Sequence, residues 1–210
     1  MKDAYVVTHP EATHHVDGLV GGWFDSELTD RGVAQAGAIA GALAERIGAA
    51  EVQVFSSDLR RARRAAEIIT ERFGAELIID PDLRERSFGA AGGRPDAWLA
   101  ERLVPLPEGA DRMQHDEGID GAETRIEAAR RAYAAMQRIH DSPGEHQVVV
   151  THGGVASYLL ASWLGMPLDS LRLVHFKVSS GGISLLRDQD DFRCHQLTFL
   201  NETSHLSQHP

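Results

Sequence analysis

The hydrophobic residues of this chain follow two different spacings along the sequence. Short apolar or alternating runs, typical of strands, occur at residues 4–8, 51–56, 77–79 and 147–151. The run at 147–151 is continuous, as expected for a strand that is buried on both faces. Two further runs, at 182–186 and 192–199, are separated by the polar residues 188–191 and predict a terminal hairpin.

Between the early strands, apolar residues recur with the period of a helix. One face begins near Thr29 and ends before Gly48, and it consists of Val33, Ala36, Ala40, Leu43 and Ile47. A second helix has Ser57 as its expected N-cap, and its apolar face consists of Leu59, Ala62, Ala66, Ile69 and Phe73. A third helix is predicted at about residues 122–140, where Asp141-Ser142-Pro143-Gly144 stops it, and a fourth begins at Gly154.

Strands that alternate with helices predict a mostly parallel sheet with helices on both faces, which is a three-layer α/β/α fold. In such sheets ligands bind beyond the carboxyl ends of the strands. Residues 89–121 break the pattern, because they are rich in Gly, Pro and charge, with Trp98 as the main apolar anchor and one short helix at about 95–103. We expect residues 1–210 to form a single domain in which the segment 89–121 caps the site.

Composition and charge restrict the function. The 210 residues are 42% hydrophobic and 25% charged, which is ordinary for a globular protein. The formal net charge of −10 argues against a nucleic-acid partner. In so acidic a protein, a site that binds an anion must contain a local cluster of positively charged side chains. Because there is no apolar run of membrane-spanning length and no signal-peptide pattern, the sequence predicts a cytoplasmic protein without a membrane partner. The one cysteine, Cys194, cannot form an internal disulfide and fits a strand better than a nucleophile.

Residues able to carry chemistry follow several of the predicted strands. His9 and His152 each stand at the end of an apolar run, and the pair Gly153-Gly154 opens a helix where backbone N–H groups can approach an anion. Glu85 follows the third strand and is expected near the same edge. The second strand leads into a helix whose first turns carry Arg60, Arg61, Arg63 and Arg64. Because the helix dipole disfavours cations there, we expect at least one arginine to face a phosphate and the others to form a solvated basic face.

With these residues in place, the chain resembles the histidine phosphatase superfamily, in its phosphoglycerate mutase-like branch. The resemblance spans nearly the whole chain in order and spacing. It rests on six segments: Thr8-His9-Pro10-Glu11-Ala12, Leu28-Thr29-Asp30-Arg31-Gly32-Val33-Ala34-Gln35-Ala36, Ser56-Ser57-Asp58-Leu59-Arg60-Arg61-Ala62, Leu83-Arg84-Glu85-Arg86-Ser87-Phe88-Gly89, Thr151-His152-Gly153-Gly154 and Asn201-Glu202-Thr203-Ser204-His205-Leu206.

The resemblance implies a phosphoglycerate mutase-like fold and a role for each matching residue. His9 would accept the phosphoryl group on a ring nitrogen, for which it must be neutral. Arg61 and His152 would bind the phosphoryl oxygens, and Glu85 would protonate the leaving alkoxide and then activate water. Gly153 would offer a backbone N–H to the phosphate. The substrate would be a small-molecule phosphate ester, and the reaction would need neither a metal nor a cofactor.

The chain also departs from the family pattern at the first motif. Thr8 stands where the family has arginine, Pro10 where it has glycine and Ala12 where it has threonine, while His15 replaces an asparagine and Ala65 a later threonine. Losing one transition-state donor costs on the order of 10²–10³ in rate. We expect Thr8 and His15 to lie against the phosphate, with a protonated His15 supplying part of the missing charge. The string at 13–17, which contains His14 and His15, also permits a metal-ligand interpretation.

Three functions remain open from the sequence. The first is a metal-independent phosphomonoesterase that acts on a small phosphorylated metabolite through a phosphohistidine intermediate. The second is a weak or inactive relative that binds a phosphorylated ligand or a partner, for which Thr8 and Pro10 are the evidence. The third is a phosphoglycerate mutase, suggested by the segment Gly22-Trp23-Phe24-Asp25. By analogy with similar folds, a homodimer is a further expectation.

Overall fold

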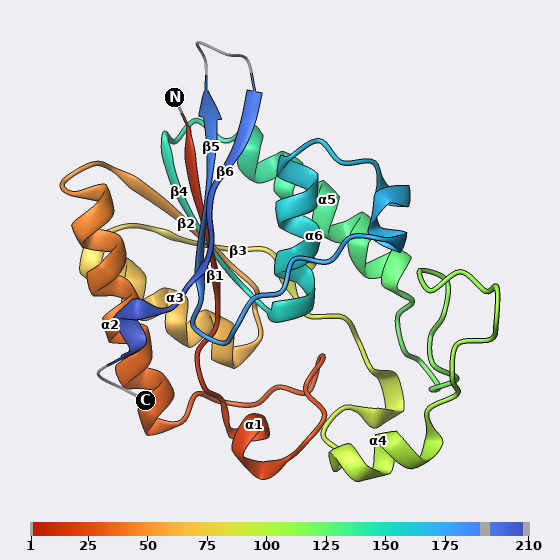
Figure 1. The fold of residues 1–210 in the computed structure, drawn as a ribbon. Coiled ribbons are helices and arrows are strands. Elements are labelled where there is room, and N and C mark those ends of the chain that lie inside the picture. The colour runs from red at the N-terminus through yellow and green to blue at the C-terminus, as the bar shows by residue number, and fades with distance from the viewer. Residues whose placement is uncertain (1, 190–193, 208–210) are drawn as a thin grey trace.

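The computed structural model describes residues 2–189 and 194–207, and within them a six-stranded sheet forms the centre of the molecule (Figure 1). Its strands lie in the order β3-β2-β4-β1-β5-β6. Four of them are parallel to one another, β1 (Asp3–Thr8), β2 (Val52–Ser56), β3 (Leu77–Ile79) and β4 (His146–Thr151). At one edge, β5 (Ile183–Gln189) and β6 (Cys194–Glu202) continue the sheet in antiparallel fashion. The predicted α/β fold with a mostly parallel sheet is confirmed.

Helices cover both faces of the sheet (Figure 1). The helices α2 (Asp30–Ile47) and α3 (Arg60–Phe73) pack on one face, and α5 (Arg125–Asp141) and α6 (Gly153–Trp163) pack on the other. Successive residues of β4 pack on opposite faces of the sheet. Val148 and Val150 belong to the hydrophobic core under α2 and α3, and Val149 belongs to the core under α5 and α6. This alternation explains why the run at 147–151 is apolar at every position.

The helix boundaries differ in places from the predicted ones. The third predicted helix begins at Arg125 instead of near 122, because Thr124 forms a capping box with Glu127. Val33 is 39% exposed, since it lies in the first turn of α2 and borders a surface pocket beside the exposed start of α3. Ser57 is not the N-cap of α3.

That helix starts three residues after Ser57 with Leu59 in the capping position. The hydroxyl of Ser57 accepts the Leu59 N–H at 3.2 Å, and the Asp25 carboxylate accepts the Arg60 N–H at 2.7 Å. A side chain from a distant segment therefore caps this helix.

The strands of the C-terminal hairpin pair as predicted, but β5 extends two residues into the polar segment that was expected to form the turn. Asp188 and Gln189 belong to β5, while 190–193, which include the predicted strand start at 192, lie outside the described residues. Cys194 is the first residue of β6 and is exposed, in agreement with its interpretation as a strand residue.

The segment 89–121 packs against residues 19–24, and its Met113 also belongs to the core cluster between the sheet and the helices α5 and α6. It contains the 3-10 turn η2 (Gly89–Ala91) and the helix α4 (Asp96–Arg102), and half-buried Trp98 packs on a small cluster of Val20, Ala91 and Ile119. Backbone hydrogen bonds of 2.8 Å join Val20 to Arg94 and Gly93. The short helix and the apolar anchor are confirmed, while the role as a cap and the single-domain assignment stay predictions.

The remaining short elements are α1 (Thr13–Asp17) and three further 3-10 turns, η1 (Pro81–Leu83), η3 (Leu168–Arg172) and η4 (Ser204–Leu206). In the part of the chain that the structure describes, no helix combines the length and the apolar composition needed to cross a bilayer.

Candidate active site

The predicted catalytic residues meet at the carboxyl ends of three adjacent strands. His9 follows β1, His152 follows β4, and Arg61 lies in the first turn of α3 just after β2. The His9 N–H donates to the Thr151 carbonyl at 2.9 Å, which fixes the ends of β1 and β4 side by side. Such a position at the carboxyl edge is where parallel sheets bind ligands.

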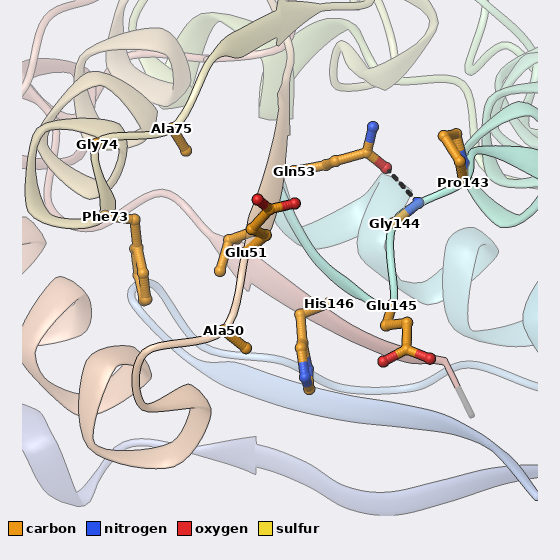
Figure 2. A pocket seen from close by; sticks show the side chains of 11 residues that line it. Ala50, Glu51, Gln53, Phe73, Gly74, Ala75, Pro143, Gly144, Glu145 and His146 are labelled. Carbon is orange, nitrogen blue, oxygen red and sulfur yellow. Dashed lines mark hydrogen bonds between the residues drawn. The ribbon is translucent and has the colours of Figure 1, made fainter.

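A large pocket at the other end of the strands has different neighbours. It has a volume of about 550 Å³ and is lined by Glu51, Gln53, Glu145 and His146 at the amino ends of β2 and β4 (Figure 2). Gln53 Oε1 accepts the Gly144 N–H there at 3.0 Å. None of the predicted catalytic residues lines this pocket, so it is not the candidate active site.

His9 is held as a neutral imidazole with one nitrogen presented to the site. Its Nδ1 lies 2.8 Å from the Pro10 carbonyl oxygen, which can only accept, so Nδ1 carries the proton and Nε2 keeps its lone pair. Arg61 Nε donates to this Nε2 at 3.2 Å. Burial, followed by the charge of Arg61, holds the pKa of His9 well below its usual value, which favours the neutral ring.

Arg61 is the one arginine of its cluster that enters the site. It is 1% exposed, and its guanidinium donates to the carbonyl oxygens of Gly22 at 2.6 Å and Phe24 at 2.7 Å. Burial lowers its pKa to about 10, against the opposing effect of Glu85 and Asp25, so it remains charged at neutral pH. The other three arginines pair on the surface with Glu27 and Glu67, as the sequence predicted for a basic face.

His152 lies beside His9, with ring centroids 5.0 Å apart and the rings nearly perpendicular. It is 1% exposed, and its Nε2 is 3.0 Å from the Ser57 hydroxyl oxygen. Its Nδ1 is buried and has no hydrogen-bond partner among the described residues. Burial and then the nearby His9 and Arg61 keep the pKa of His152 well below its usual value.

The carboxylate of Glu85 is fixed by two backbone N–H groups. Arg86 donates to Oε1 at 2.8 Å, and Gly154, in the first turn of α6, donates to Oε2 at 2.9 Å. The Glu85 carbonyl oxygen in turn accepts from Trp23 Nε1 at 2.6 Å and from Arg131 at 2.8 Å. A β-carbon on Gly154 would come within 2.5 Å of Oε1, so glycine at this position lets the carboxylate approach the helix.

The structure gives Thr8 a different position from the predicted one. Its hydroxyl donates to the Ser179 carbonyl and accepts the Gly182 N–H at 3.1 Å, and the residue is 3% exposed. The single hydroxyl proton is therefore used inside the protein and is not offered to a phosphate. Thr8 connects the end of β1 to the segment before β5, and the prediction of phosphate binding by its hydroxyl is corrected.

His15 reaches the site but does not favour the charge that the sequence argument assigned to it. Its ring stacks on that of His9, with centroids 5.5 Å apart and an interplanar angle of 13°. Its Nδ1 accepts the Ala12 N–H at 3.2 Å, which leaves the proton of the neutral ring on Nε2. Burial and Arg61 lower the pKa of His15, although Glu11 opposes them, so the neutral form is favoured.

Several residues that support the site are not predictable from the sequence. The segment 22–25, whose sequence suggests a mutase, holds three parts of the site: the carbonyls of Gly22 and Phe24 bind Arg61, Trp23 binds the Glu85 backbone, and Asp25 caps α3. No single residue of this segment signals these contacts. The position of Ser57 was recognised, but as a helix cap and not as the partner of His152.

The metal interpretation of residues 13–17 gains no support. His14 is buried, its Nδ1 lies 2.6 Å from the Ser26 hydroxyl, and burial lowers its pKa to about 3. Among the described residues, the groups spaced to hold a metal ion do not include His14 or His15.

Gly153, at the first position of α6, has a helix N-terminal N–H that lacks an intrahelical acceptor, as the phosphate-binding role requires.

A buried histidine pair thus lies with an arginine and a carboxylate at the carboxyl edge of an α/β sheet, and comparison with known proteins identifies the family. The family model of the histidine phosphatase superfamily, branch 1, matches residues 4–199. The chain therefore belongs to this superfamily.

Relatives of more than one activity resemble the chain. A probable phosphoglycerate mutase of Yersinia pestis is 31% identical over 184 residues, which cover 84% of this chain and 81% of that protein. A mycobacterial glucosyl-3-phosphoglycerate phosphatase, solved with VO3, superposes with a TM-score of 0.78 at 25% identity over 97% of this chain and 100% of the other. The α-ribazole phosphatase of Shigella flexneri gives 0.77 at 26% identity, over 95% and 96% of the two chains.

Proposed function

We propose that the protein is a metal-independent phosphomonoesterase that transfers the phosphoryl group of a small ester first to His9 and then to water. One observation carries this proposal: the Pro10 carbonyl fixes the proton of His9 on Nδ1, so that the Nε2 lone pair faces Arg61 beside a second buried histidine. A nucleophilic imidazole needs this neutral form and this orientation.

In the first step, His9 Nε2 attacks phosphorus and the bond between phosphorus and the ester oxygen breaks. The electron pair of that bond goes to the ester oxygen, which takes the proton of a Glu85 carboxyl group that enters this step protonated. Each Glu85 oxygen accepts one backbone N–H, which leaves a second lone pair on each oxygen to hold the proton. Arg61 Nε, which faces the His9 lone pair in the free protein, shifts its hydrogen bond to a phosphoryl oxygen and offsets the charge that develops.

In the second step, water attacks the phosphorus of phosphohistidine while Glu85 accepts a proton from it. The bond between nitrogen and phosphorus breaks, its electron pair returns to His9 Nε2, and inorganic phosphate leaves. Glu85 thus gives a proton in one step and receives one in the next, so the enzyme returns to its starting state.

Two neutral donors take the place of the arginine that Thr8 replaces. His15 carries its proton on Nε2, and the stacked position against His9 brings this ring to the phosphate. When the Ser57 hydroxyl donates to His152 Nε2, the His152 proton lies on Nδ1, the buried atom that has no partner among the described residues. A phosphoryl oxygen would satisfy this atom.

The alcohol part of the ester is proposed to be small and polar. A hollow of about 670 Å³ adjoins the site at His15 and Glu11, and hydroxyl groups of Ser179, Ser180 and Thr203 are among its lining. Such a surface suits a hydroxylated or charged alcohol better than an apolar one. A cytoplasmic location, the absence of nucleic-acid and membrane partners, and a homodimer stay predictions from the sequence.

The test is phosphate release from a panel of esters that includes 3-phosphoglycerate, glucosyl-3-phosphoglycerate and α-ribazole phosphate, with His9→Ala as control. We expect release with at least one ester and none with the variant. An alkaline quench, which preserves the bond between nitrogen and phosphorus, should trap one phosphoryl group per chain on His9. Release equal to the control for every ester would leave the binding-only function, and transfer within 3-phosphoglycerate instead of to water would identify a mutase.

A further inference from the structure

A second group of histidines lies at the opposite end of the sheet from the candidate active site. His140 is in the last turn of α5, Asp188 is in β5 and His195 is in β6. The Asp188 N–H donates to the Lys2 carbonyl at 2.8 Å, so the group lies beside the start of β1, whereas His9 follows its end (Figure 1). The six residues of β1 separate the two places by about 20 Å.

The three side chains converge on the Asp188 carboxylate. His140 Nε2 is 3.0 Å from Oδ2, and His195 Nδ1 is 2.7 Å from Oδ1. One donor atom from each of the three residues lies within 4.8 Å of the other two. A tetrahedral zinc ion with bonds of 2.0–2.1 Å spaces its ligand atoms about 3.3 Å apart, so small side-chain rotations bring these atoms to that spacing.

The surroundings supply what a metal site needs beyond its ligands. Asp141 Oδ1 lies 3.6 Å from His140 Nδ1, on the side where a carboxylate commonly orients a metal-binding imidazole. The Trp163 ring contacts both histidines, with centroid distances of 5.1 Å and 5.9 Å. Its buried indole N–H has no acceptor among the described residues, and Trp163, His140 and His195 all line a pocket of about 280 Å³.

We propose that His140, Asp188 and His195 bind a divalent transition metal ion of the Zn²⁺ type. Two imidazole nitrogens and one carboxylate oxygen are ligands that Zn²⁺ prefers, and three protein ligands leave a fourth position for water or a small anion. The pocket holds that fourth ligand, and the Trp163 N–H donates to it. The ion would join the C-terminal turn of α5 to the edge hairpin of β5 and β6, at the opposite end of the sheet from His9.

The competing explanation is an ion pair of Asp188 with two protonated imidazoles. Within the described residues, the side-chain partners of this carboxylate are these two rings, and the nearby Lys2 ammonium donates instead to the carbonyls of His140 and Ser142. The two explanations require different protonation states of the histidines. A nitrogen that binds a metal ion must be deprotonated, whereas an ion pair with Asp188 needs a protonated ring. Direct measurement of metal binding therefore separates the two.

The first test titrates the chelator-treated protein with ZnCl₂ in competition with a chromophoric chelator. The wild type should bind one Zn²⁺ that His195→Ala binds about 100-fold more weakly or not at all, since even an outer partner of a metal ligand is worth 10–100-fold. The His195 side chain is 45% exposed, so its loss should leave the fold intact. His175→Ala, which removes an exposed histidine elsewhere, is the matched control and should bind like the wild type.

Zinc binding that is equal in the wild type and His195→Ala, or no binding by the wild type at up to about 0.1 mM, overturns the proposal. Equal binding would place the ion elsewhere, for example at the histidines of the active site.

The second test identifies the ligands. Co²⁺ in a four-coordinate site of nitrogen and oxygen ligands gives intense visible absorption bands, and Asp188→Asn, which keeps the shape of the side chain, should weaken them strongly. Zn²⁺ should also raise the melting temperature of the wild type and leave that of His195→Ala unchanged. Co²⁺ bands that persist in Asp188→Asn would show that this carboxylate is not a ligand and would overturn the site as proposed.

Discussion

The position of the Glu85 carboxylate depends on the missing side chain of Gly154, and Gly154→Ala tests this dependence. The added β-carbon would lie 2.5 Å from Oε1, whereas ordinary contact begins at 3.4 Å, so the carboxylate must move by roughly 0.9 Å. That displacement breaks the 2.9 Å hydrogen bond from the Gly154 N–H. A misplacement of about 1 Å at a reacting group can cost on the order of 10² in rate, and we expect a fall in kcat/KM of that size.

The choice of ester makes the assay specific for proton transfer by Glu85. An alkyl phosphate needs its leaving oxygen protonated, whereas an aryl phosphate releases a stable phenolate. Gly154→Ala should therefore lower the rate of alkyl ester cleavage much more than that of aryl ester cleavage. In the Glu85→Gln background, the same substitution should add almost nothing, because the two changes remove one function.

Gly37→Ala is the matched control. It lies in the exposed part of α2 with nothing within 4 Å of the added β-carbon, so it should preserve activity and stabilise the fold by about 0.4–1 kcal/mol. Circular dichroism melting should show that Gly154→Ala remains folded. A folded Gly154→Ala protein that keeps wild-type rates on both esters, or that loses both rates equally, would refute the proposed proton transfer by a Glu85 side chain held against Gly154.

Three further predictions concern the groups around His9. Arg61→Ala should lower kcat/KM for phosphate release by about 10²–10³. Arg61→Lys should restore little of this loss, because lysine lacks the planar guanidinium group; full activity of the lysine variant would contradict the proposed contact of Arg61 with the phosphoryl group. Thr8→Val should lower the free energy of unfolding in urea by about 1–3 kcal/mol, since the Ser179 carbonyl and the Gly182 N–H lose their partner, and it should leave KM unchanged. A raised KM with unchanged stability would show instead that Thr8 binds the phosphate. Because the pKa values of His9 and His152 are lowered, the native rings stay neutral while the unfolded ones gain protons below about pH 6.5. Below that pH, and above their native pKa values, these two residues should lower the free energy of unfolding by about 2.7 kcal/mol per pH unit, and a flat profile between about pH 7 and 5 would contradict this.

The residues of the candidate site were predictable because each stands at a strand end or a helix start. Apolar runs located β1 and β4, and parallel pairing then required His9 and His152 to meet at one edge. Arg61 was one of four candidates from the sequence, and the choice among them depended on which helix face turns inward. The contacts of Arg61 with the Gly22 and Phe24 carbonyls could not be predicted, because backbone acceptors have no sequence signal.

The errors share one physical cause. Thr8 was placed at the phosphate and Ser57 at a helix start because their neighbours in the sequence suggested those roles. Their hydroxyls instead bind Ser179, Gly182 and His152, which lie far away along the chain. A hydroxyl can satisfy its hydrogen bonds in many ways, and only the surrounding packing selects one.

The order of strands and helices along the chain, the family and the candidate catalytic residues can be predicted from the sequence alone, since periodicity and short motifs encode burial and local backbone conformation. Three other properties appear only in the folded chain: which nitrogen of His9 is free, the preference of His15 for its neutral form, and the convergence of His140, Asp188 and His195. These properties depend on distances between residues that are remote in the chain. No local pattern carries that information, because it arises only when the sheet and its helices are assembled.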